Sequence, residues 1–370
     1  MSGDARQGAH GFSADVAWIR AQFQKGVPSY FALLGHVQTM LEAPHSELQR
    51  ALDRAWTGRT FHVAYDRPLL FLAALRADAL TEGPSHPLYR AIGTDRPEPE
   101  QVDDVCVRDA LAADRTRLFA WLATRRVQTN DTLRSIAWRW PAYLAGCEGG
   151  ALPVALVDLG ASAGLNLVAE RLPAVWTDGR GVAIPAVTAV RAVVRLGLDA
   201  RPVDLADPEN VTWMRACIWP GDRGRLERLE VGLRAFYDAA REGAAPVLEQ
   251  ADVTAFAARV ARLAVAHSDA LVLVYQTVLR DYLSPELRRA HHAAMYEWLG
   301  AFAPGRGVWV ELESRSTDAE HPEPAALTAH ARCPEGQVRA FEIARTLHHP
   351  IEVKPMAEAV RELERALRSR

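Results

Sequence analysis

The spacing of hydrophobic residues changes near residue 150 of the chain. Before that point apolar residues recur every three or four positions, which is the spacing of one helix face. In the segment 13–26, for example, Val16, Ile19 and Phe23 would lie on the same face. The same pattern is repeated in 29–42, 67–83, 103–125 and 129–146. The pattern predicts no strand before residue 150 and an all-helical N-terminal domain over residues 1–147.

After residue 150, short apolar runs alternate with helical patterns. The run ALVDLG (155–160) ends at a glycine, as a buried parallel strand does. Further strands are expected in 187–199, 246–253, 270–278 and 307–314, with one or two edge strands in 337–353. Helices are expected in 210–220, 224–243, 255–267 and 284–302. This alternation predicts an α/β fold over 148–370, with a mostly parallel, doubly wound sheet.

The overall composition excludes several classes of function. The chain has 43 Lys and Arg against 46 Asp and Glu. It therefore lacks the excess of basic residues that would indicate a nucleic-acid or membrane-surface partner. The N-terminus lacks the pattern of a signal peptide, and no apolar run approaches the roughly 20 residues of a membrane span. We expect a cytoplasmic protein with no nucleic-acid or membrane partner and a small-molecule substrate.

Cysteine and histidine spacing gives no metal-binding motif. The four cysteines lie far apart without a C-x-x-C pair, which predicts reduced and mostly buried thiols. The doublets His291-His292 and His348-His349 lack ligand spacing and acidic neighbours in the sequence. We expect these histidines to be surface or packing residues, and we expect no metal site.

The stretch D-L-G-A-S-A-G-L-N, residues 158–166, allows four interpretations. Its G-A-S-A-G matches the G-x-S-x-G elbow of a hydrolase nucleophile, Ser162, but that elbow normally follows several strands and an upstream oxyanion loop. A dinucleotide fingerprint would need glycines where Ser162 and Leu165 stand. A glycine turn that only packs a helix against a strand is the third interpretation. The fourth is a loop that binds S-adenosylmethionine, which we favour.

A first strand ending in an acid, followed by a glycine-rich turn into a helix, is typical of class I S-adenosylmethionine enzymes. Asp158 would face the amino-acid end of the cofactor, or support a residue that does. Gly160 and Gly164 would let the backbone approach the methionine and ribose portions closely. The remaining residues predicted to bind the cofactor in this stretch are Ala161, Ser162 and Asn166.

Three further candidate residues lie at the ends of predicted strands. Ligands of open parallel sheets lie beyond the carboxyl ends of the strands, which makes Tyr275 and Gln276 candidate catalytic residues. Asp199, at the end of the predicted second strand, is a candidate for cofactor binding.

The chain resembles the bacterial domain-of-unknown-function family 2332, whose members look like methyltransferase-type Rossmann proteins. The resemblance runs nearly end to end through RRVQTNDTLRSIAW, LVDLGASAGLNL, VVRLGLDARPVDLADPENV, RACIWPGDRGRLERL and LVLVYQTVLRDYL. It implies a Rossmann-like class I methyltransferase fold with an N-terminal helical lid. It also implies that Asp252 contacts the adenine and that Gln128 and Asn130 reach the pocket, with Asn130 assigned to catalysis. The T-N-D sequence at 129–131 is explained equally well as a helix N-cap.

These expectations lead to an enzyme of methyltransferase type that uses S-adenosylmethionine and acts on a small molecule. An alternative is intramolecular cyclisation of S-adenosylmethionine, in which its α-amine attacks the γ-carbon to give azetidine-2-carboxylate and methylthioadenosine. In that case S-adenosylmethionine is the substrate rather than a cosubstrate. A further alternative is a non-catalytic protein that only binds the cofactor.

Overall fold

The computed structural model describes residues 11–61, 65–128, 130–317 and 322–369, which form two units. Within these residues, the helical unit comprises 11–128 and 204–227, and the sheet unit comprises 130–203 and 228–369. The division therefore differs from the expected boundary at 147/148. One reason is that the helix over 136–144 packs against two strands of the sheet, and another is that the helix over 208–216 packs among the N-terminal helices.

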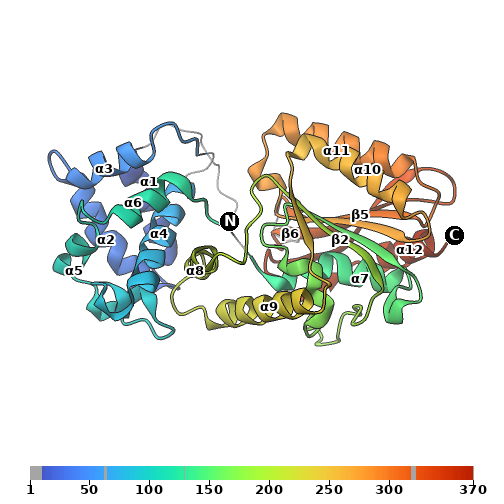
Figure 1. Cartoon of the computed structure of the whole chain (residues 1–370), viewed down its shortest axis with the longest axis horizontal. Coiled ribbons are helices and arrows are strands. Elements are labelled where there is room, and N and C mark those ends of the chain that lie inside the picture. The colour runs from blue at the N-terminus through green and yellow to red at the C-terminus, as the bar shows by residue number, and fades with distance from the viewer. Residues whose placement is uncertain (1–10, 62–64, 129, 318–321, 370) are drawn as a thin grey trace. The chain divides into compact units, whose positions relative to one another are not determined.

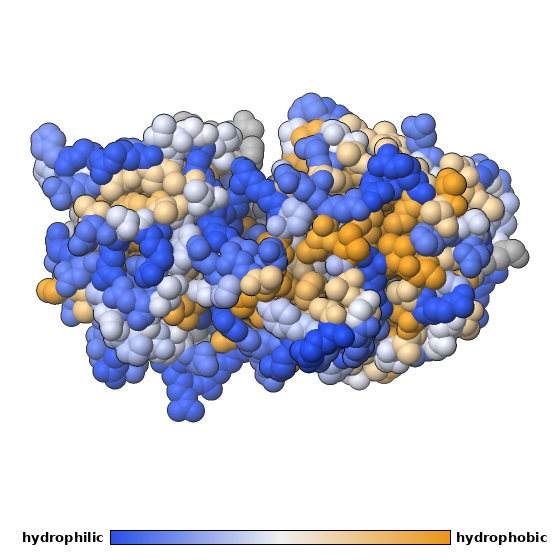
Figure 2. Space-filling view, viewed as in Figure 1, coloured by the Kyte–Doolittle hydropathy of each residue, from blue (hydrophilic) through white to orange (hydrophobic). Residues whose placement is uncertain are grey.

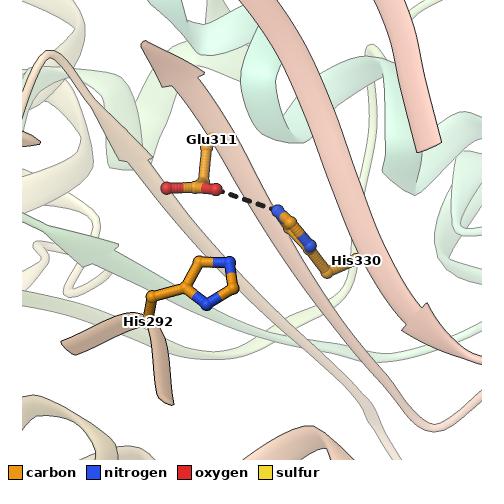
Figure 3. A group of neighbouring side chains, drawn as sticks. All are labelled: His292, Glu311 and His330. Atoms are coloured by element: carbon orange, nitrogen blue, oxygen red, sulfur yellow. Dashed lines mark hydrogen bonds and ion pairs between the residues drawn. The ribbon is translucent and has the colours of Figure 1, made fainter. Parts of the chain in front are cut away.

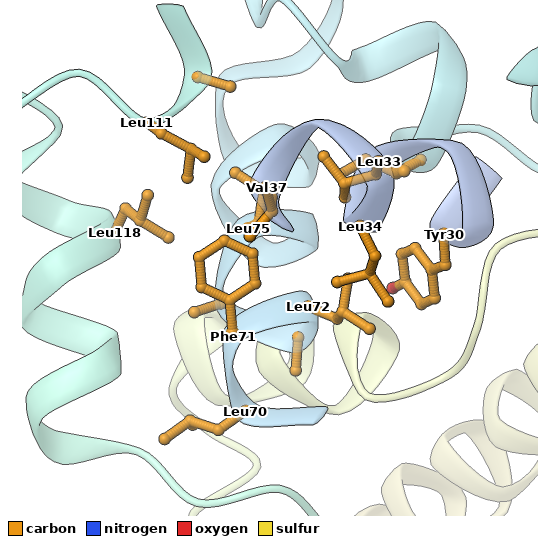
Figure 4. Close-up of a cluster of buried hydrophobic side chains, with 14 of the residues drawn as sticks. Tyr30, Leu33, Leu34, Val37, Leu70, Phe71, Leu72, Leu75, Leu111 and Leu118 are labelled. Atoms are coloured by element: carbon orange, nitrogen blue, oxygen red, sulfur yellow. The ribbon is translucent and has the colours of Figure 1, made fainter. Parts of the chain in front are cut away.

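The helical unit is organised around one apolar helix. Its α-helices are α1 (Phe12–Phe23), α2 (Pro28–Glu42), α3 (Glu47–Ala55), α4 (Asp66–Glu82), α5 (Asp104–Ala110), α6 (Thr116–Thr124) and α8 (Pro208–Ala216). Helix α4 packs against α1, α6 and α8, and its residues 70–79 are all buried. Only Arg76 and Asp78 are charged within this stretch, and a helix that is apolar on nearly every side favours such a central position. Figure 4 shows Phe71 and Leu75 of α4 near Val37 of α2 and Leu118 of α6. As predicted, the described residues before 150 contain no strand.

The sheet unit contains one eight-stranded mixed sheet, which confirms the predicted α/β class. The strands are β1 (Val154–Leu159), β2 (Ala192–Asp199), β3 (Val247–Gln250), β4 (Leu271–Thr277), β5 (Gly307–Ser314), β6 (Ala325–Arg332), β7 (Val338–Thr346) and β8 (Val353–Pro355). Their order is β3-β2-β1-β4-β5-β6-β7-β8. The pairs from β3 to β5 are parallel, and the pairs from β5 to β8 are antiparallel. The first five strands are those that the hydrophobic pattern predicts.

Helices cover both faces of the sheet (Figure 1). Helices α10 (Phe256–Ala266) and α11 (Pro285–Gly300) pack on one face, and α7 (Ile136–Leu144) and α12 (Ala357–Arg368) pack on the other. Helix α9 (Arg223–Arg241) packs through Ala235 and Ala239 against Val168. Successive strand residues alternate between the two covered faces, so the central strands β1 and β4 are apolar along most of their length.

Two local expectations are corrected by the structure. The helix expected after the glycine-rich turn is only a short 3-10 segment, η6 (Leu165–Arg171), interrupted by the non-helical backbone of Val168. Strand β6 was not expected, because its sequence AALTAHAR is rich in alanine, which has little intrinsic strand preference. It is nevertheless buried between β5 and β7, and partners on both sides stabilise it.

The edge of the sheet at β2 and β3 exposes apolar residues. Figure 2 shows hydrophobic side chains gathered where these strands lie, and Val193 and Val247 are 38% and 58% exposed. No helix among the described residues is both long and apolar enough to cross a membrane.

Candidate functional site

The loop after β1 has an unusual backbone conformation. Gly160, Ser162 and Gly164 have φ angles of 81°, 51° and 70°, all in the left-handed region that favours glycine. The backbone N–H of Ser162 donates to Oδ2 of Asp199 at 2.8 Å. The carbonyl of Ser162 accepts from the N–H of Val203 at 3.0 Å. The end of β2 and the chain that follows it therefore hold this loop, which we call the β1 loop (residues 160–164).

The β1 loop lies at the point where the sheet changes direction. From β1 the chain adds β2 and β3 on one side and then returns to add β4 and β5 on the other. In open parallel sheets this switch point, at the carboxyl ends of the two central strands, is where ligands bind. At the end of β4, Val278 has a φ of 56°, which is rare for a β-branched residue. Strained backbone on both sides of the switch point is typical of a functional site.

Asp158 and Tyr275 lie opposite each other on β1 and β4. They are register partners in the parallel pair, and both are buried. Burial, together with the charge of Asp199, raises the pKa of Asp158 from 3.8 to about 7. Burial and the neighbouring Asp158 raise the pKa of Tyr275 well above 10.0. Asp158 therefore lies near the midpoint of its titration at neutral pH, as a proton-exchanging group requires.

Gln276 does not share this environment, because successive strand residues point to opposite faces. Its side chain is fully buried toward α10 and α11. The amide nitrogen donates to Oε1 of Glu311 at 3.1 Å and to Oε1 of Glu313 at 2.9 Å. The amide oxygen interacts with Nε2 of His291 at 2.8 Å. The structure therefore separates the two residues expected to act together in catalysis, Tyr275 and Gln276.

Several predicted site residues carry buried polar atoms without a hydrogen-bond partner among the described residues. In the sheet unit these atoms include Nδ2 of Asn130, Oγ of Ser162 and Oδ1 of Asn166. The short helix after Asn130, η4 (Thr132–Ser135), packs against η6, which contains Asn166. Oε1 of Gln128 is also buried and without a partner, but it belongs to the helical unit. Buried polar atoms are normally satisfied, so these atoms are available to a ligand.

Other predicted residues have structural roles in the described chain. Asp252 is exposed, and its carboxylate accepts from the N–H of Thr254 at 3.0 Å as the N-cap of a 3-10 turn. Ala161 is buried, and its Cβ would lie 2.7 Å from a Cβ added to Gly197 of β2. Close packing of the β1 loop on β2 therefore requires glycine at position 197.

Three residues on the α11 side of the sheet form a group that the sequence analysis missed. Nitrogen atoms of His292 and His330 and a carboxylate oxygen of Glu311 all lie within 4.8 Å of one another (Figure 3). Nε2 of His330 is 2.9 Å from Oε2 of Glu311. His292 comes from α11, Glu311 from β5 and His330 from β6.

Both histidine doublets have acidic side chains beside them in the fold, although none adjoins them in the sequence. His292 lies beside Glu311, and Nδ1 of His349 is 2.8 Å from Oδ2 of the buried Asp131. Arg228 also bonds to Asp131 through its Nε at 3.1 Å. Burial alone would raise the pKa of Asp131, but the bonds from His349 and Arg228 outweigh it and hold the pKa far below 3.8. All these acids are distant from the doublets in the sequence, so spacing could not indicate them.

An open cavity of about 420 Å³ lies in the helical unit and contains none of the predicted site residues. It is lined by Arg117, Ala120, Trp121, Thr124, Arg125 and Glu209.

Comparison with known proteins identifies the family of the chain. No curated protein and no solved structure matches the chain. Residues 19–354 match the model of a family described as uncharacterized proteins conserved in bacteria, DUF2332. The match includes every strand of the sheet except the last residue of β8, and it includes the β1 loop and the group of His292, Glu311 and His330. The chain therefore belongs to the bacterial family DUF2332.

Proposed function

We propose that the chain is an enzyme of methyltransferase type that binds S-adenosylmethionine at the β1 loop and acts on a small molecule. The observation that carries the proposal is the position of this loop at the switch point between β1 and β4. The finer fold assignment, a Rossmann-like class I methyltransferase fold, is part of the same proposal. The strand order β3-β2-β1-β4-β5 supports it.

The chemistry of the residues around the loop fits this ligand. S-adenosylmethionine carries an ammonium, a carboxylate and hydroxyl groups, and it supplies an electrophilic carbon attached to a sulfonium. The unpartnered Asn130 Nδ2 is a donor for an anionic or hydroxyl oxygen, and Asn166 Oδ1 is an acceptor for an ammonium or hydroxyl group. The glycines of the β1 loop leave its backbone open to close approach.

Asp158 is the residue best suited to handle a proton. Its carboxyl group is buried, and its pKa of about 7 allows it to hold or release a proton at neutral pH. An ammonium group placed beside it would favour the ionised form. Tyr275 remains protonated because its pKa is raised, so its hydroxyl is a hydrogen-bond donor and not a base. Catalysis would otherwise consist of positioning the reactants in a water-poor site.

Binding of S-adenosylmethionine to the whole chain, measured by calorimetry, tests the proposal. A matched pair of variants locates the binding. Gly164 and Gly243 both have positive φ angles, of 70° and 71°. A Cβ added to Gly164 would lie 2.8 Å from Cδ2 of Leu248, whereas a Cβ added to Gly243 would meet nothing within 4 Å. Gly164→Ala should weaken binding, and Gly243→Ala should leave it unchanged. Absence of binding by the wild type rejects the proposal.

Product analysis by mass spectrometry distinguishes the possible reactions. S-adenosylhomocysteine formed only after addition of a bacterial extract supports methyl transfer to a small molecule. Methylthioadenosine and azetidine-2-carboxylate formed from S-adenosylmethionine alone would replace methyl transfer by cyclisation. Binding without any product would assign the chain to cofactor binding only.

A further inference from the structure

The group of His292, Glu311 and His330 lies on a different face of the sheet from Asp158. Trp309 and Glu311 of β5 face α10 and α11, as does Gln276 of β4. Asp158 and Tyr275 point to the opposite face, because strand residues alternate. A function of this group is therefore independent of the proposed S-adenosylmethionine site.

We propose that His292, Glu311 and His330 bind a divalent transition-metal ion such as Zn²⁺, Co²⁺ or Fe²⁺. Their ligand atoms are two imidazole nitrogens and one carboxylate oxygen, all within 4.8 Å of one another. Two histidines and one carboxylate are a common protein ligand set for such ions, and this set leaves coordination positions open. The absence of a thiolate disfavours Cu⁺, and the two imidazoles disfavour Ca²⁺ and Mg²⁺.

The spacing of the two buried ligands suits coordination. Nε2 of His330 and Oε2 of Glu311 are 2.9 Å apart. Two adjacent ligands of an octahedral ion, with bonds of about 2.1 Å at right angles, lie about 3 Å apart. The distance between the two atoms therefore matches that between two neighbouring ligands of one ion. His292 is exposed on α11, and its ligand atom already lies within 4.8 Å of the other two.

Neighbouring side chains orient the two buried ligands. The second nitrogen of His330, Nδ1, is 3.0 Å from the hydroxyl of Tyr296. The second oxygen of Glu311, Oε1, accepts from the amide of Gln276 at 3.1 Å. The ring of Trp309 stacks on His330 with centroids 4.5 Å apart. Partners of this kind fix the orientation and protonation of metal ligands, and their removal typically lowers affinity about 10- to 100-fold.

The same neighbours also hold the exposed ligand. The His292 ring stacks on Tyr296, with centroids 4.4 Å apart, because the two residues are one helical turn apart on α11. It also contacts Trp309 edge-on at 5.5 Å. The exposure of His292 means that an ion bound here is reachable from solvent, so an external ligand can occupy its open positions.

The test is metal binding by the chelator-treated whole chain without S-adenosylmethionine. Co²⁺ is titrated and followed by its visible absorption, Zn²⁺ is measured by calorimetry, and Fe²⁺ is titrated without oxygen. We expect one ion per chain. His330→Gln and His292→Ala should each weaken binding at least 100-fold, and Tyr296→Phe about 10- to 100-fold. His292 is exposed and the Tyr296 change is conservative, so both variants should fold.

His267→Ala is the matched control, because His267 lies in the same unit but outside the group. Its metal affinity should equal that of the wild type. The proposal is overturned if the folded wild type binds none of the three ions. It is also overturned if His292→Ala and Tyr296→Phe bind as tightly as His267→Ala. In either case the contact of Glu311 with His330 is only a buried hydrogen bond. A failure to bind S-adenosylmethionine affects neither result.

Discussion

The carboxylate of Asp199, at the end of β2, accepts a hydrogen bond from the backbone N–H of Ser162 at 2.8 Å. Its other oxygen accepts from the N–H of Arg201 at 2.7 Å. The end of one strand thereby fixes the backbone of the loop that follows its neighbour.

Asp199→Ala should loosen the β1 loop and weaken binding of S-adenosylmethionine. A hydrogen bond to a charged group contributes about 1.5–3 kcal/mol, which corresponds to a loss of about 10- to 100-fold in affinity. Calorimetry measures the effect, with Asp269→Ala as the control because Asp269 is exposed and far from the loop in the sequence. Equal affinities for the two variants would contradict the role of Asp199.

Ser162 separates the loop interpretation from the nucleophile interpretation. Ser162→Ala should retain most of the product formed from S-adenosylmethionine, because the backbone of Ser162, not its hydroxyl, makes the contacts to Asp199 and Val203. Ser162→Gly should raise the free energy of unfolding by about 1 kcal/mol, because glycine adopts a φ of 51° without strain. Complete loss of activity in Ser162→Ala with intact cofactor binding would instead identify a nucleophile.

Gly197 of β2 should not tolerate a side chain. An added Cβ would lie 2.5 Å from Cδ2 of Leu248 and 2.7 Å from Cβ of Ala161. Leu248 can shift, but Ala161 moves only with the β1 loop. Gly197→Ala should therefore lower the free energy of unfolding by about 1–3 kcal/mol in urea denaturation. Gly300→Ala is the control, since a Cβ there meets nothing within 4 Å, and it should be neutral or stabilising.

Asp158 should make stability depend on pH. Because burial raises its pKa from 3.8 to about 7, the folded chain retains a proton that the unfolded chain releases between these values. The protonated Asp158 therefore adds to the free energy of unfolding at pH values below this range, and this contribution is lost as the pH rises through the range. Asp158→Asn removes the effect, so its stability relative to the wild type should rise by on the order of 4 kcal/mol between about pH 4 and about pH 8.

Urea denaturation of both proteins across this pH range measures the difference, and Asp269→Asn serves as the exposed control. If the stability curves of wild type and Asp158→Asn run parallel, Asp158 is not titrating in this window.

Part of the candidate site follows from local sequence. The segment VALVDL is apolar on both faces up to Asp158, so a buried parallel strand ending at a glycine turn is its expected structure. The left-handed backbone of Gly160 and Gly164 is likewise expected, because glycine adopts it without steric cost. The positive φ of Ser162 and Val278 was not predictable, since both residues disfavour it and only tertiary contacts enforce it.

The sequence by itself therefore determined the five parallel strands, most of the helices and the glycine-rich turn, because hydrophobic periodicity and glycine placement act over a few neighbouring residues. Tertiary structure alone decided that residues 204–227 belong to the helical unit and that β6 pairs with β5. It also brought His292, Glu311 and His330 together from three elements. Such contacts depend on strand order and register between distant segments, which no single segment encodes.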